Sequence, residues 1–277
     1  MHSHINAPTQ YVTSGKVQYA FRRFGSKGAT PILLLQHFTG GMDHWDPKIT
    51  DGLAAHREVI LFDNAGIGAS GGETPRTIEE MAEHVKAFVD AIGLEKFDLL
   101  GFSMGGMVAQ AYTERHGSTV RKLILVGTSP RGGDPTEFQA EVSQRARGDA
   151  GLPEMAWLFF GHSESGQKAA AEFWERRHAR EIDRDPPTRL DSIMAQVAAG
   201  RDWLRPDGER FARLRNITVP TLVANGSRDV MLPTINSFYL QQHIPYAQLI
   251  IYPDAGHAPH FQYPDLFLVH AKLFLEA

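Results

Sequence analysis

Ser103 lies in the pentapeptide Gly101-Phe102-Ser103-Met104-Gly105, the stretch of this chain whose residue types point most directly to chemistry. An apolar run at 97–100 predicts a strand before it, and the run at 107–112 predicts a helix after it. A serine in the tight turn between a strand and a helix presents its hydroxyl at the carboxyl end of a sheet, and small residues two positions away relieve crowding there. The pattern predicts a nucleophilic serine, although the pentapeptide alone also fits a helix N-cap.

A serine hydroxyl is a poor nucleophile at neutral pH and needs a base that is itself oriented by a carboxylate. His257 suits the base, because it lies in a loop after the strand-like run at 248–252, beside Gly256. In a strand–elbow–helix arrangement the base also comes last in the chain. His260 is the alternative, but it lies nearer the closing helix, and we interpret it as a loop or packing residue.

Asp229 is the candidate acid, since it lies in the turn after the strand-like run at 221–224. Asp254 is closer in sequence to His257, but so short a separation gives little reach for orienting the ring, and we interpret Asp254 as a turn former. No carboxylate follows the strand that ends at Val126 within the next three residues. The turn after that strand is the other natural location for the acid, and because it lacks a carboxylate the sequence favours Asp229.

Two backbone N–H groups must stabilise the oxyanion that forms in acyl transfer. One donor is predicted at Met104, directly after the serine, and the other at Phe38, in the loop 36–41 after an earlier strand. The glycine pair in that loop allows backbone to approach a substrate closely. We expect His37 to brace the loop through hydrogen bonds, because His257 already fills the position of the base.

The composition excludes several classes of function. The chain has 277 residues, is 42% hydrophobic and carries a formal net charge of −4, so we expect neither nucleic acid nor an anionic membrane as a partner. The absence of cysteine excludes disulfides, a catalytic thiol and thiolate metal sites, and we expect no metal and no cofactor. No signal peptide or membrane-spanning run is recognisable, and we expect a cytoplasmic protein.

Strand-like and helix-like segments alternate along most of the chain, which predicts an α/β fold with a mostly parallel sheet flanked by helices on both faces. The first two strands are predicted to form an antiparallel hairpin. The strand-like runs are 11–14, 17–24, 31–36, 58–62, 97–100, 122–126, 221–224 and 248–252, and the clearest helical patterns are 77–92 and 265–276.

The interval 131–216 interrupts this alternation, because turn signals divide it into helix-sized pieces without a buried-strand run. We interpret it as a helical cap, or lid, inserted into a core formed by 1–130 and 217–277. Most of its apolar residues are expected to pack onto the core, while a few face the serine. The tentative pocket residues are His37, Trp157, Phe160, Trp174 and Met194.

Together these motifs resemble those of the α/β-hydrolase superfamily, at 37–41, 63–70, 101–106, 225–229 and 254–257. The chain looks most like the small bacterial serine esterases, lactonases and cofactor-free perhydrolases with a helical lid. Members of the superfamily that use an aspartate nucleophile, such as dehalogenases and epoxide hydrolases, are disfavoured by Ser103. The arginine that commonly follows the aspartate of the glycine loop is replaced here by Asn64-Ala65, so its bracing role is not carried over.

The resemblance implies a serine hydrolase that cleaves a carboxylic ester or lactone of a small-molecule acyl substrate through an acyl-enzyme. His257 would take the proton of Ser103, Asp229 would orient the imidazole, and the Phe38 and Met104 amides would hold the oxyanion. The alternatives are a C–C bond hydrolase, a cofactor-free perhydrolase or haloperoxidase, and a non-catalytic binding protein. The sequence leaves the substrate and the oligomeric state open.

Overall fold

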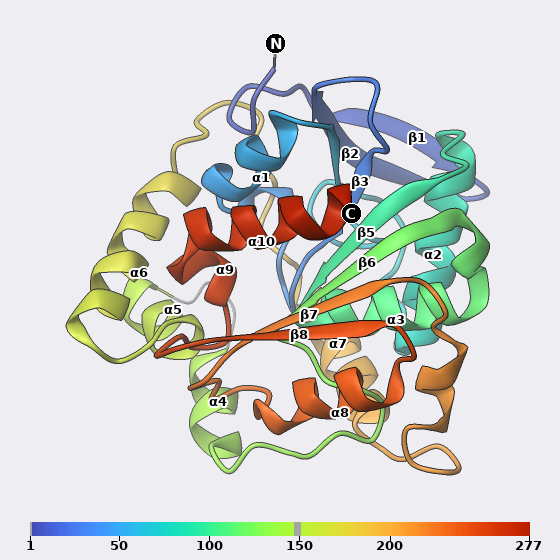
Figure 1. Ribbon diagram of the computed structural model, residues 1–277. Helices are drawn as coiled ribbons and strands as arrows, with labels where there is room; N and C mark the ends of the chain where they lie inside the picture. Colours follow the sequence, from blue (N-terminus) through green and yellow to red (C-terminus); the bar gives the residue numbers. More distant parts are fainter. Residues whose placement is uncertain (1, 147–150) are drawn as a thin grey trace.

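The computed structural model describes residues 2–146 and 151–277, and an eight-stranded sheet lies at its centre (Figure 1). The order of the strands across the sheet is β1-β2-β4-β3-β5-β6-β7-β8. The pairs β1–β2 and β2–β4 are antiparallel and the other neighbours are parallel, which confirms the predicted sheet. The strands are β1 (Gln10–Ser14), β2 (Val17–Gly25), β3 (Ile32–Leu35), β4 (Glu58–Phe62), β5 (Phe97–Phe102), β6 (Val120–Val126), β7 (Thr221–Gly226) and β8 (Ala247–Tyr252).

Helices cover both faces of this sheet. On one face α1, α9 and α10 pack against the strands, and on the other face α2, α3 and α8 do so (Figure 1). The central strands β3 and β5 are therefore buried along their whole length, as the apolar sequence of β3 and the mostly apolar sequence of β5 predict. The helices are α1 (Pro47–Ala54), α2 (Ile78–Ala91), α3 (Met104–His116), α4 (Gln139–Arg145), α5 (Leu152–Phe159), α6 (Glu164–Arg177), α7 (Leu190–Trp203), α8 (Ile235–His243), α9 (Pro259–Gln262) and α10 (Pro264–Glu276).

The segment between β6 and β7 contains α4, α5, α6 and α7, and its described residues form no strand. It lies over the carboxyl ends of the strands, since residues of α5 and α7 line the same cavity as Ser103. That part of the molecule is where loops after parallel strands bring side chains together. Of the helices that the structure describes, none is both long and apolar enough to cross a membrane.

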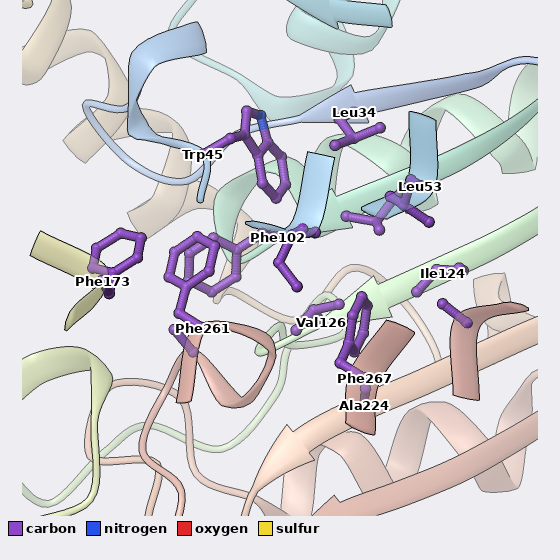
Figure 2. Close-up of a cluster of buried hydrophobic side chains, with 14 of the residues drawn as sticks. Leu34, Trp45, Leu53, Phe102, Ile124, Val126, Phe173, Ala224, Phe261 and Phe267 are labelled. Carbon is purple, nitrogen blue, oxygen red and sulfur yellow. The ribbon is translucent and has the colours of Figure 1, made fainter. Parts of the chain in front are cut away.

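An aromatic cluster joins this helical segment to the end of β5 (Figure 2). Phe173 of α6 stacks on Phe261 of α9 with ring centroids 4.4 Å apart, and Phe261 lies 5.5 Å from Phe102, the last residue of β5. Trp45, which is fully buried, packs on Phe102 from the loop before α1. Such aromatic contacts bury large areas with defined geometry, so they fix the residue directly before Ser103.

Candidate active site

Ser103 lies at the junction of β5 and α3 with φ 55° and ψ −119°, an unusual conformation for a residue with a side chain. A side chain does not fit at the glycines two positions before and two positions after Ser103. A Cβ at Gly101 would lie 2.4 Å from the carbonyl oxygen of Gly105, and a Cβ at Gly105 would lie 2.1 Å from that of Leu35. The Gly-x-Ser-x-Gly sequence therefore folds here into a turn that only glycines allow, and this turn holds the serine at the end of the strand.

Ser103, His257 and Asp229 form one hydrogen-bonded chain. His257 Nε2 lies 2.8 Å from Ser103 Oγ, and His257 Nδ1 lies 2.8 Å from Asp229 Oδ2. A carboxylate can only accept, so the imidazole donates from Nδ1 and its Nε2 accepts from the serine hydroxyl. All three side chains are buried. The arrangement can remove a proton from Ser103, and the structure brings together the three residues singled out in the sequence.

Contacts of the backbone hold Asp229 and His257 in this chain of hydrogen bonds. Asp229 follows β7, and its second oxygen, Oδ1, accepts from the backbone amides of Met231 and Leu232 at 2.8 and 2.9 Å. These two bonds hold the carboxylate with Oδ2 toward His257. His257 follows β8, and a Cβ on Gly127 would lie 2.3 Å from the carbonyl oxygen of His257. The close approach of the two loops therefore depends on a glycine after β6.

The amides of Phe38 and Met104 are the donors that the sequence predicts for the oxyanion. In the described part of the chain neither N–H has a hydrogen-bond partner, and Phe38 lines the same cavity as Ser103. His37 Nδ1 donates to the carbonyl of Phe38 at 2.7 Å, the bracing bond expected from the sequence. The Thr39 amide donates to Gln196 Oε1 at 2.8 Å, so α7 also holds this loop.

A cavity of about 150 Å³ opens onto Ser103. One part of its wall is apolar and comes mainly from α5, and the other part is polar and contains two histidines and an arginine. Burial lowers the pKa of His37 to about 3 and that of His44 well below its usual value, and the positive charge of Arg177 acts in the same direction. The described lining residues are His37, Phe38, Thr39, His44, Ser103, Ala146, Met155, Leu158, Phe159, Arg177, Pro187, Thr188, Ile193 and Met231.

Of the tentative pocket residues, the structure places only His37 in this lining. Met194 is 55% exposed on α7, one position beyond Ile193, which does line the cavity. Phe160 is buried against Phe173, away from the cavity. The sequence interpretation of Met194 and Phe160 as pocket residues was wrong, because packing and helix rotation, rather than apolar character, decide which side chains face the serine.

Two tryptophans of the insertion were also assigned wrongly to the pocket. Trp157 packs on the ring of His162 and under the guanidinium of Arg145, and Trp174 packs on His178. The residues of α5 that line the cavity are Met155, Leu158 and Phe159. Their i, i+3, i+4 spacing marks one helical face and is the signal that would have found them.

Two other polar residues that follow β8 have structural contacts and do not contact Ser103 or Asp229. His260 is fully buried among aromatic rings, including Phe102 at 4.5 Å, as the packing interpretation predicts. Asp254 has φ 52° and accepts a hydrogen bond from Ser163, so it lies in a turn and contacts the insertion rather than His257.

Comparison with known proteins gives the same fold. Residues 30–264 match the family model described as the alpha/beta hydrolase fold. An alpha/beta hydrolase fold protein from Chitinophaga pinensis is 35% identical, covers all of both chains and has a TM-score of 0.94. A protein of Azorhizobium caulinodans provisionally named carbamate hydrolase RutD is 31% identical over 86% of this chain and 88% of its own. A pimeloyl-[acyl-carrier protein] methyl ester esterase of Nitrosomonas europaea is 26% identical over 87% and 94%.

Proposed function

The chain belongs to the alpha/beta hydrolase fold family, and from this premise we propose that it is a serine hydrolase of small carboxylic esters or lactones. The observation that carries the proposal is the buried chain of hydrogen bonds from Asp229 through His257 to Ser103, with both links 2.8 Å long. It supplies a nucleophile, a base and an orienting acid in the geometry that acyl transfer needs.

The proposed reaction begins when Ser103 Oγ attacks the acyl carbon and its proton passes to His257 Nε2. Asp229 stabilises the imidazolium that forms, while the amides of Phe38 and Met104 donate to the oxyanion. The C–O bond of the ester then breaks, and the proton on Nε2 passes to the departing alcohol oxygen. Water attacks the acyl-enzyme with His257 again as base, releasing the carboxylic acid and restoring the Ser103 hydroxyl.

The size of the cavity limits the substrate. A volume of about 150 Å³ resembles the cavities that hold a benzene-sized molecule, so it admits a short acyl chain or a single ring beside the serine. Met155, Leu158 and Phe159 give this space an apolar wall. We therefore propose short acyl groups, and a cytoplasmic location is retained as part of the proposal.

A panel of substrates tests the function. We expect turnover of p-nitrophenyl esters from acetate to hexanoate to fall as the chain lengthens, and the same panel includes lactones, a methyl carbamate and a vinylogous 1,5-diketone. Ser103→Ala is expected to lower kcat/KM by roughly 10³-fold or more. Ser237→Ala is the matched control, since Ser237 is also buried but lies on α8.

Each other outcome of the panel selects a different function. Turnover of the diketone without ester turnover would assign C–C bond hydrolysis, and peroxide-dependent bromination in acetate would assign perhydrolysis. Carbamate turnover that exceeds ester turnover would place this chain with the relative from Azorhizobium by activity. Full ester hydrolysis in the Ser103→Ala variant would contradict the serine mechanism.

A further inference from the structure

The end of α5 and the turn after it pack against the loop that carries His257. The amide of Ala258, directly after His257, donates to the carbonyl of Phe159 at 2.9 Å. On the other side of His257, a Cβ on Gly256 would lie 2.7 Å from the carbonyl oxygen of Phe160. The helical insertion therefore contacts the backbone on both sides of the proposed base.

Gln262 joins these two segments through both ends of its side-chain amide. Its Oε1 accepts from the amide of Gly161 at 2.7 Å, and its Nε2 donates to the carbonyl of Asp254 at 2.9 Å. Gly161 lies two positions after the end of α5, whereas Asp254 lies three positions before His257. One buried side chain therefore bridges the insertion and the loop of the base.

Contacts of the backbone determine where this bridge lies. A Cβ on Gly161 would lie 1.8 Å from the carbonyl oxygen of Asp254, so the two segments meet at a glycine. Gln262 is the last residue of the short helix α9, and its own amide donates to the carbonyl of Ala258 at 3.2 Å. The bridging side chain is therefore anchored to the residue that directly follows His257.

We propose that Gln262 is a positioning residue for the proposed base, because its two hydrogen bonds hold the loop of His257 against the insertion. The proposal rests on the proposed ester hydrolysis, in which His257 Nε2 must lie within hydrogen-bond reach of Ser103 Oγ. Gln262 is not among the described residues that line the cavity, so it acts through the backbone. A displacement of about 1 Å at a catalytic group can lower a rate by about 10²-fold.

Two matched substitutions test this role. Gln262→Met keeps the length of the side chain and removes both hydrogen bonds. We expect kcat on p-nitrophenyl acetate to fall by about 10- to 100-fold and KM to change by less than about 3-fold, since the base and not the cavity is displaced.

Asn236→Leu is the control, because Asn236 is also buried and also bridges two segments through its side-chain amide. Its bonds to the amide and carbonyl of Asp134, in the segment between β6 and β7, are 2.7 and 2.9 Å long. Asn236 lies on α8, away from His257. We expect a comparable loss of stability in the control, but a kcat near that of the wild type.

Gln262→Glu gives a result that a loss of packing would not give. A protonated carboxyl group can accept from Gly161 and donate to Asp254, whereas a carboxylate can only accept. Burial raises the pKa of the introduced carboxyl group, and the nearby carboxylate of Asp254 acts in the same direction. The variant therefore keeps both hydrogen bonds at low pH and loses one as the pH rises.

We expect the ratio of variant to wild-type kcat to be near 1 at about pH 5 and to fall by about 10-fold at about pH 9, because the misplacement of the base follows the ionisation. The ratio removes the titration of His257 itself, which both proteins share. A ratio that stays near 1 at the higher pH would overturn the positioning role. This variant keeps the test decisive if Gln262→Met does not fold.

A measurement on His257 separates this inference from the proposed reaction. Proton NMR follows the Nδ1 proton that His257 donates to Asp229, and we expect its resonance to shift in Gln262→Met and to stay unchanged in Asn236→Leu. That result would support the positioning role even if no ester were hydrolysed, in which case only the proposed function fails. Ester hydrolysis through Ser103 with the same kcat in both variants would leave the function standing and overturn the positioning role.

Discussion

The hydroxyl of Thr188 donates a 2.8 Å hydrogen bond to the main-chain carbonyl of Thr39. Thr188 belongs to the segment between α6 and α7, whereas Thr39 follows β3 in the loop that contains Phe38. The Thr39 amide is held as well, by Gln196 of α7. The helical insertion therefore fixes the loop in which one of the proposed oxyanion donors lies, in addition to walling the cavity.

Thr188→Val should lower kcat by several-fold while the protein remains folded. Loss of one hydrogen bond costs about 1 kcal/mol, and here the cost appears as misplacement of the Phe38 amide. Initial-rate kinetics on p-nitrophenyl acetate measure the effect. Thr113→Val is the control, because Thr113 bonds to the carbonyl of Ala109 within α3. Equal kinetics in the two variants would mean that the insertion does not position the loop.

Gly105→Ala should destabilise the protein strongly. The added Cβ would lie 2.1 Å from the carbonyl oxygen of Leu35, so β3 and α3 must separate. Overpacking of this kind costs about 1–3 kcal/mol or more. Gly117→Ala is the matched control, since its Cβ would meet nothing nearer than Thr113 at 3.9 Å. Urea unfolding compares them, and equal midpoints would refute the steric account of the turn.

His260→Phe should make the free energy of unfolding depend less steeply on pH in the acid range. Burial, with smaller effects from His257 and His37, lowers the pKa of His260 well below its usual value. The unfolded chain therefore binds a proton at His260 below about pH 6.5 that the folded chain does not, and the free energy of unfolding falls as the pH is lowered. Each such histidine contributes a slope of about 1.4 kcal/mol per pH unit.

The variant should lose that contribution between pH 6 and pH 5, and it should be no less stable than the wild type at pH 7. In the described structure neither ring nitrogen of His260 has a partner, and aromatic rings surround it. Urea unfolding at several pH values measures the slope, with His162→Gln as a surface control. An unchanged slope in His260→Phe would show that His260 is not the group that takes up the proton.

Asp229→Asn should lower kcat by about 10²- to 10⁴-fold with little change in KM. An amide in place of the carboxylate removes the charge that stabilises the imidazolium and can fix the wrong tautomer of His257. Asp254→Asn is the matched control, since Asp254 was the alternative acid and bonds to Ser163 instead. A larger loss in the control than in Asp229→Asn would reverse the assignment of the acid.

The sheet was predictable because its central strands are short apolar runs, such as Ile32–Leu35, and its hairpin alternates. The hydrogen-bonded contact of Ser103, His257 and Asp229 was also predictable, since each follows a strand and the chain order matches the elbow arrangement. The helix α1 was not predicted. It depends on local signals, the Asp46 side chain that accepts from the Lys48 amide and a proline at its first position.

The cavity could not be predicted from residue types alone. Trp157 and Phe159 are both apolar and lie in the same helix, yet only Phe159 faces the serine, because rotation around α5 separates them. The polar wall was missed for a different reason. His44 and Arg177 are 133 positions apart, and only the packing of α6 over the β3 loop brings both to one cavity.

Fluorophosphonate labelling followed by peptide mapping tests the central claim most directly. The reagent phosphonylates a serine only where a base activates it and donors hold the new oxyanion. We predict a single adduct on Ser103 in the wild-type protein, and a labelling rate at least roughly 10³-fold lower in His257→Ala. An adduct on another residue, or labelling of Ser103 that proceeds unchanged without His257, would contradict the account.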